Sequence, residues 1–305
     1  MHRRQAFLLT LAPLFATAAL AQSPAPPPGG GLLAEARRYL PHLSDIFGGD
    51  LPELDRPNAI KLTLRPHFGD LVRRDYLRMD TGLRWAMNEN FEIKTAAAVF
   101  FTHGLKDSAG YGIGRLSGGA KYIFDDLPWR DYETSFELAG EFPVGHPPPD
   151  LTDGYNHVRP GFAIQHLTER NPHLTLFGGL GLDLITTSAL PGAPGRNQPR
   201  DDSISFTGGG VYDAGQIKWT FTSTYATTAL LGDRPHHFLY LQPGLLWYVP
   251  RRFTFNSKSQ FIVGLGARST FGPDGSDFSL NSRLRVEFTL RQFMDGIRQR
   301  AAKGR

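Results

Sequence analysis

From Asn58 onward, apolar and polar residues alternate with a period of two along most of the chain. Such alternation predicts β-strands, because successive side chains of a strand point to opposite faces. Twelve segments follow this pattern, and they cover residues 60–68, 77–85, 91–101, 116–124, 132–142, 158–164, 174–184, 204–212, 217–225, 239–249, 253–267 and 284–290. The pattern therefore predicts an all-β chain of about twelve strands, with ten and fourteen as the alternatives.

The connections between these segments alternate in length. The odd-numbered ones are mostly long, as in Gly145–Asn156 and Ala189–Asp202, and the even-numbered ones are mostly short, as in Asp213–Gly215. An antiparallel up-and-down meander with tight turns at one end and loops at the other has this rhythm. Bacterial outer-membrane barrels place the short turns in the periplasm. An even strand count would leave both chain ends on that side.

The last segment shows why the orientation of the faces matters. Leu284, Val286 and Phe288 alternate with Arg283, Arg285 and Glu287. In a soluble sheet the charged face meets bulk water, whereas in a membrane barrel the apolar face meets lipid and the charged face lines the interior. Charges recur on the polar faces of many segments, and a dry core would require each of them to be paired. This favours a barrel with a wet interior.

Aromatic residues gather near the ends of the apolar faces. Rings at such positions are typical of the girdles at membrane interfaces. The alternative is a soluble periplasmic β-protein with the aromatic residues in its core. The residues concerned are Trp85, Tyr122, Tyr132, Phe142, Tyr212, Trp219, Tyr225 and Trp247.

The N-terminus has the three parts of a secretory signal peptide. Arg3 and Arg4 precede an apolar run, and the sequence Ala19-Leu20-Ala21 predicts cleavage after Ala21. The run is interrupted by Pro13 and is shorter than the roughly 20 residues that span a bilayer. Because the chain has no cysteine, an exported form must be stabilised without disulfides, as a fully paired barrel is.

These observations divide the chain into four parts. Residues 1–21 form the signal peptide, and residues 22–57 form a Pro/Gly-rich linker followed by a short periplasmic helix with apolar residues at helical spacing. That helix either stays in the periplasm or reaches into the lumen as a plug. Residues 58–290 form the β-barrel, and residues 291–305 form a basic periplasmic tail.

The signal peptide, the alternating segments, the rhythm of the connections and the final RLRVEFTLRQF together resemble bacterial outer-membrane β-barrel proteins. In that class an aromatic residue near the end is read by the barrel-assembly machinery, and Phe288 or Phe293 would take that part, although a tail follows. The resemblance implies outer-membrane lipid and that machinery as partners. It also implies a channel or transporter for small solutes. The stretch GEFPVGHPPP is similar to a strand ending in transporter-like barrels encoded with phenol-degradation pathways.

Signals for catalysis are missing from the pattern. No histidine lies two residues from a serine with an asparagine following, as an outer-membrane hydrolase requires, and no nucleotide, zinc or haem motif is present. We therefore expect no enzyme, no cofactor and no metal site. The net charge of +4 indicates no nucleic-acid partner, since an exported protein rarely meets one.

The charged positions of the polar faces are the candidate pore lining. In a closed ring of twelve strands, an acidic fifth strand would stand across from a basic wall on the twelfth, first and second strands, and the field between them would select polar solutes. The alternative is that Lys121 and Arg159 pair with the glutamates. The predicted lining residues are Lys61, Arg65, Arg78, Arg84, Glu133, Glu137, Glu141, Arg283 and Arg285. Other possible functions are a closed structural or adhesive outer-membrane barrel and a soluble periplasmic binding protein.

Overall fold

The structure is a computed structural model that describes residues 59–67, 76–102, 110–125, 127–128, 132–148, 151–167, 171, 173–194, 197–232, 234–255, 257, 259–289, 291 and 294. Its strands are β1 (Ala59–Pro66), β2 (Tyr76–Ala86), β3 (Phe91–Thr102), β4 (Tyr111–Asp125), β5 (Tyr132–Pro143), β6 (Tyr155–Leu167), β7 (Leu174–Thr187), β8 (Ser203–Asp213), β9 (Ile217–Thr227), β10 (His237–Val249), β11 (Gln260–Gly272) and β12 (Gly275–Thr289). The prediction of an all-β chain with twelve strands is confirmed.

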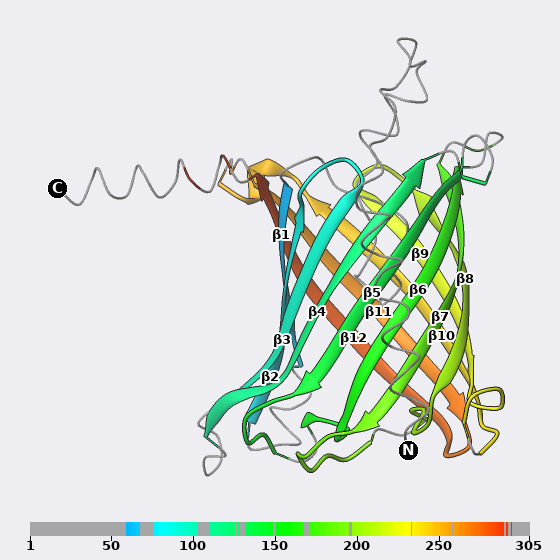
Figure 1. Ribbon diagram of the computed structural model, residues 1–305. Helices are drawn as coiled ribbons and strands as arrows, with labels where there is room; N and C mark the ends of the chain where they lie inside the picture. The colour runs from blue at the N-terminus through cyan, green and yellow to red at the C-terminus, as the bar shows by residue number, and fades with distance from the viewer. Residues whose placement is uncertain are drawn as a thin grey trace. The chain divides into compact units, whose positions relative to one another are not determined.

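The twelve strands close into one antiparallel barrel in which every strand pairs with its neighbours in sequence. The closing pair is β1 with β12, with Lys61 opposite Glu287 and Leu64 opposite Leu284. Closure leaves neither β1 nor β12 with an unpaired edge, as a strand barrel in lipid requires. Figure 1 shows the tilted strands, with the start of β1 and the end of β12 at the upper end.

The two faces of each strand confirm the inverted arrangement. On β9, Trp219 and Phe221 point outward with 55% and 49% of their surface exposed, whereas Lys218 and Thr222 on either side of them point inward and are buried. The same outward exposure holds for Leu176, Phe206 and Leu265 on other strands. An apolar exterior around a polar interior suits lipid outside and water inside.

The last two strands differ from the prediction. β11 begins at Gln260 and runs on to Gly272, and β12 begins at Gly275, so that only Pro273 and Asp274 separate them. The stretch that looked like a long loop is thus a hairpin, because Asp-Gly forms tight turns and Gly275 adopts the left-handed φ of +91°. The preceding connection is longer than expected and contains the 3-10 helix η2 (Arg251–Phe253).

Several predictions fall on other parts of the chain. The signal peptide with its cleavage near Ala21, the linker and the helix before residue 58 lie outside the described residues. The same holds for residues 291–305, except Arg291 and Met294. Among the described residues, no helix has the length and apolar character needed to cross a membrane.

Candidate functional site

The interior of the barrel contains a cavity of about 910 Å³. All twelve strands contribute to its wall, together with Asn197, Gln198 and Pro199 from the connection between β7 and β8. Seven cationic side chains and five carboxylates line the cavity, an excess of positive charge. The cations are Arg65, Arg84, Lys94, Arg115, Arg159, Arg268 and Arg283, and the carboxylates are Asp80, Glu137, Glu141, Asp183 and Asp277.

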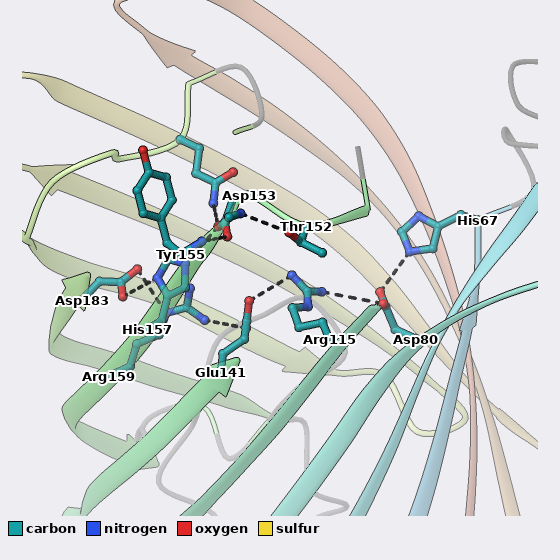
Figure 2. Close-up of polar contacts among 12 residues, drawn as sticks. His67, Asp80, Arg115, Glu141, Thr152, Asp153, Tyr155, His157, Arg159 and Asp183 are labelled. Atoms are coloured by element: carbon teal, nitrogen blue, oxygen red, sulfur yellow. Dashed lines mark hydrogen bonds and ion pairs between the residues drawn. The ribbon is translucent and has the colours of Figure 1, made fainter. Parts of the chain in front are cut away.

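One part of the cavity wall carries a row of alternating basic and acidic side chains that we call the charge ladder. It consists of His67, Asp80, Arg115, Glu141, Arg159, Asp183, His157 and Asp153 (Figure 2). Its members come from β2, β4, β5, β6 and β7 and from the connections after β1 and β5. The row therefore follows the inner wall from strand to strand.

The first half of the ladder centres on Glu141. Its two carboxylate oxygens accept hydrogen bonds from Arg115 at 3.0 Å and from Arg159 at 2.9 Å. Arg115 also lies 3.7 Å from Asp80, whose other oxygen lies 2.9 Å from Nε2 of His67. Ala98 stands between Arg115 and Asp80 in the strand register, and its small side chain lets the two charges meet across β3.

The second half of the ladder centres on His157, which is 1% exposed. Its Nδ1 lies 2.8 Å from Asp183, and its Nε2 lies 2.9 Å from Asp153. Asp183 in turn accepts a hydrogen bond from Nε of Arg159 at 3.1 Å, which joins the two halves. A histidine between two carboxylates holds three segments of chain together, namely β6, β7 and the connection before β6.

Asp153 lies in that connection, outside the strands. Burial alone would raise the pKa of this carboxyl group, but hydrogen bonds from His157, from the Tyr155 backbone N–H and from Gln198 outweigh it and lower the pKa to about 2. Asp153 is therefore an anion at neutral pH, and it fixes Gln198 at the rim of the cavity through a 2.5 Å hydrogen bond.

A neighbouring part of the cavity wall, on β1, β10, β11 and β12, has a different composition, and we call it the arginine wall. It consists of Arg65, which stands opposite Asp80 of the ladder in the strand register, and of Arg268, Arg283, Tyr240 and Asn281. Arg268 stacks its guanidinium over the ring of Tyr240, with Cζ 4.6 Å from the ring centroid. Arg65 donates a hydrogen bond to Oδ1 of Asn281 at 2.5 Å. Among the described residues, Arg65 and Arg268 have no carboxylate within ion-pair distance.

Residues Asn197–Pro199, which we call the strap, link these two parts of the wall. Buried Asn197 donates from Nδ2 to the Gly275 carbonyl at 2.8 Å and accepts at Oδ1 from the Asp274 N–H at 3.1 Å. Its own carbonyl accepts a hydrogen bond from the Tyr240 hydroxyl at 2.9 Å. With Gln198 bound to Asp153 at the opposite end, the strap connects the charge ladder to the arginine wall and to the β11–β12 turn.

The connection between β5 and β6 is anchored by apolar packing against residues of the barrel. Leu151 packs in a cluster with Tyr76 and Phe100, and a side chain at Gly114 would collide with it, since a Cβ there would lie 2.2 Å from Leu151 Cδ2. The glycine in β4 thus makes room for the leucine. This packing places Asp153 where it reaches His157.

The structure brings five of the nine predicted lining residues to the cavity: Arg65, Arg84, Glu137, Glu141 and Arg283. Lys61 and Arg285 lie on the same inward faces but are 1% and 0% exposed, so they are packed in the interior rather than on the cavity wall. Arg78 and Glu133 also belong to inward faces and are not among the residues that line the cavity.

The predicted acidic wall is largely neutralised by neighbouring cations. Glu137 pairs with Lys94, and Glu141 pairs with Arg115 and Arg159. Pairing between Arg159 and a glutamate is the alternative that the sequence left open. The contacts of Lys94 and Arg115 were not anticipated, because they depend on which residues the strand register places side by side.

Comparison with known proteins supports the class that this architecture defines, a bacterial outer-membrane β-barrel. The crystal structure of the COG4313 outer membrane channel from Pseudomonas putida F1 matches with a TM-score of 0.52 and 13% identity, over 80% of this chain and 99% of that protein. At this identity the similarity concerns the fold alone.

Two further solved structures were matched with lower scores. The KdgM porin in complex with disordered oligogalacturonate has a TM-score of 0.42 and 9% identity, over 76% of this chain and 99% of that protein. Acinetobacter baumannii OccAB4 has a TM-score of 0.36 and 12% identity, over 70% of this chain and 53% of that protein. No protein-family model matches the chain, and no curated protein matches it.

Proposed function

We propose that this chain is an outer-membrane channel through which small polar solutes diffuse, with a preference for anions. The observation that carries the proposal is the cavity of about 910 Å³, whose lining comes from every strand and includes charged side chains of both signs. A barrel that served only as an anchor has no need of a cavity lined with seven cations and five carboxylates.

The preference for anions follows from the balance of these charges. In the charge ladder, Arg115 and Arg159 lie within ion-pair distance of Asp80, Glu141 and Asp183, so the ladder's carboxylates on the cavity lining each face a cation. The arginine wall keeps its positive charges without ion pairs at Arg65 and Arg268. Rings of fixed charge on a pore wall raise the local concentration of the opposite ion and so select it.

The proposal includes the location and route of the chain. Residues 1–21 are removed after export. The barrel-assembly machinery then inserts the barrel, with Phe288 or Phe293 as its signal. The apolar exterior of the barrel supports this route, because it matches outer-membrane lipid. The narrower resemblance to barrels encoded with phenol-degradation pathways stays a prediction. We propose no enzyme activity, no cofactor and no nucleic-acid partner.

Reconstitution in a planar bilayer tests the channel directly. We expect stepwise currents in KCl. Under a KCl gradient, we expect a reversal potential whose sign indicates a preference for chloride over potassium. A slower-migrating band after boiling checks that the inserted protein is a folded barrel. Folded protein that inserts without conducting would contradict the channel and favour a closed structural barrel. Release into the periplasmic fraction would favour a soluble binding protein.

A further inference from the structure

Arg268 has an unusual environment for a side chain inside a barrel. Its guanidinium lies over the ring of Tyr240, and its Nε is buried with no hydrogen-bond partner among the described residues. Most buried donors in proteins are satisfied, and an unsatisfied one at a charged group is costly. The cation–π contact positions the guanidinium and leaves its N–H groups to other partners, since Tyr240 offers it a ring face.

Arg65 adds a second guanidinium to the same wall. Its hydrogen bond to Oδ1 of Asn281 orients the group, and the same assignment of the amide leaves Nδ2 of Asn281 as a further donor. Arg65 lies within electrostatic range of Arg268, Arg115 and Arg78. Like charges in a confined interior repel one another, and a bound anion would offset that repulsion.

The charge ladder shows what arginines in this cavity normally contact. Arg115 and Arg159 each have carboxylates at hydrogen-bonding distance. For Arg65 the electrostatically nearest acid is Asp80, which is already bound by His67 and Arg115. Asp277 interacts with Arg268 only at longer range, and its side chain is bound to the backbone of Phe278. The described part of the chain supplies neither arginine with a carboxylate of its own.

We propose that Arg65, Arg268 and Asn281 form a binding site for the carboxylate of a small organic acid inside the cavity. The site rests on the proposed function, because the solute arrives through the lumen. Each guanidinium offers a planar fork of N–H donors that matches the two oxygens of a carboxylate. Ser279, opposite Arg268 in the register, and Thr270 also line the cavity and contribute hydroxyl donors.

Saturation-transfer NMR on the full chain in detergent micelles tests the site without requiring transport. The probes are butyrate and its neutral isostere butyramide. We expect saturation transfer to butyrate with a millimolar dissociation constant, and at least fivefold less to butyramide. Arg268→Gln and Arg65→Gln should each weaken butyrate binding at least fivefold. Arg268→Lys, which keeps the charge but loses the fork, should weaken it by a smaller factor.

Arg159→Gln is the matched control, because it removes one positive charge from the same cavity while Glu141 keeps Arg115 and Asp183 keeps His157. We expect this variant to bind butyrate about as tightly as the parent protein. Equal loss of binding in Arg159→Gln and Arg268→Gln would overturn the site, since only the overall charge would then matter. Equal binding of butyrate and butyramide would overturn it as well.

The channel and the binding site can be refuted independently of each other. A folded protein that binds butyrate but carries no current would refute the channel and leave the site standing. A conducting protein that shows no butyrate binding would refute the site alone. For each variant, the boiling-dependent gel shift establishes that the barrel has formed.

Discussion

The charge ladder and the arginine wall line the same cavity with the same kinds of side chain, yet they differ in how the charges are compensated. In the ladder, Glu141 joins Arg115 and Arg159, and His157 joins two carboxylates. In the arginine wall, Arg268 contacts the face of Tyr240, and Arg65 contacts the neutral amide of Asn281. The ladder is an internally paired network, whereas the arginine wall keeps uncompensated positive charge at Arg65 and Arg268.

This difference separates two tasks that charged residues perform inside a barrel. Paired charges bind neighbouring strands and loops to one another and contribute little net field. Unpaired charges stabilise nothing by themselves, and the free energy of burying them has to be recovered from a solute or from water. We infer that the ladder maintains the shape of the cavity and that the arginine wall determines what enters it.

The largest expected effect comes from reversing the charge of the arginine wall. Arg65→Glu combined with Arg268→Glu turns an excess of two positive charges on the cavity lining into an excess of two negative ones. Because fixed charge on the wall selects the counter-ion, the reversal potential in a KCl gradient should change sign. Arg251→Glu with Arg252→Glu, in the exposed η2 helix, makes the same change in net charge away from the cavity. That control should keep the parent selectivity, and a sign change there would show that the wall is not the determinant.

The next effect concerns the strap that connects the two parts of the cavity wall. Asn197→Ala removes two side-chain hydrogen bonds, to Gly275 and Asp274, at a residue whose φ is +50°. At about 1 kcal/mol for each bond, release of the strap should become roughly 30-fold more favourable. We expect larger and noisier single-channel currents and faster tryptic cleavage after Arg200.

Two variants separate the causes at this position. Asn197→Gly tolerates the left-handed backbone but also loses the hydrogen bonds, so it should behave nearly like the alanine variant if the bonds matter most. Asn156→Ala removes a partly exposed asparagine with only a 3.5 Å side-chain contact and should leave the current unchanged. Unaltered currents in both Asn197 variants would mean that the strap does not restrict passage.

The sequence predicted the fold well because alternation and closure are local properties repeated many times. Lys61, Thr63 and Arg65 face inward and Ile60, Leu62 and Leu64 face outward, as the period of two requires. The pattern is ambiguous where both faces are apolar. In β10 the inward Leu246 packs with Val211 and Ile262, so the polarity of the residues does not reveal which face is which.

The candidate site was predicted less completely, for two physical reasons. Arg268 and Asn281 lie just outside the predicted segments, since the Asp-Gly hairpin was taken for a long loop and both strands were cut short. The ladder depends on the register across six strands, from β2 to β7, and no single segment reveals that His157 lies between Asp153 and Asp183. The alternation of residues 174–184 does place Asp183 on the inward face. The predicted lining residues came only from the most charged strands, so Asp183 was not among them.

A smaller effect is expected from the ladder itself. Glu141→Gln leaves Arg115 without its 3.0 Å carboxylate and should lower the free energy of unfolding by about 1 kcal/mol, since these arginines are partly exposed to the cavity. Urea titration in lipid vesicles, followed by tryptophan fluorescence, measures the loss. Asp277→Asn removes the same charge from the lining without breaking an ion pair. Both variants should shift the reversal potential alike, but only Glu141→Gln should lose stability.

The smallest effect at neutral pH should come from Asp153→Asn, which loses the charge that binds His157 but keeps an acceptor for the Tyr155 N–H. Because the hydrogen bonds hold the pKa of Asp153 at about 2, below its ordinary 3.8, its contribution to stability is complete above pH 4 and is lost as the pH falls toward 2. The urea midpoint of the parent protein should therefore exceed that of Asp153→Asn at pH 7 and at pH 5, and the two should converge near pH 2.

Asp201→Asn, in the β7–β8 connection, serves as the control and should follow the parent protein throughout. A difference between the parent and Asp153→Asn that disappears already at pH 5 would mean that Asp153 is protonated too easily to bind the strap. The link between the ladder and the arginine wall would then depend on Asn197 alone.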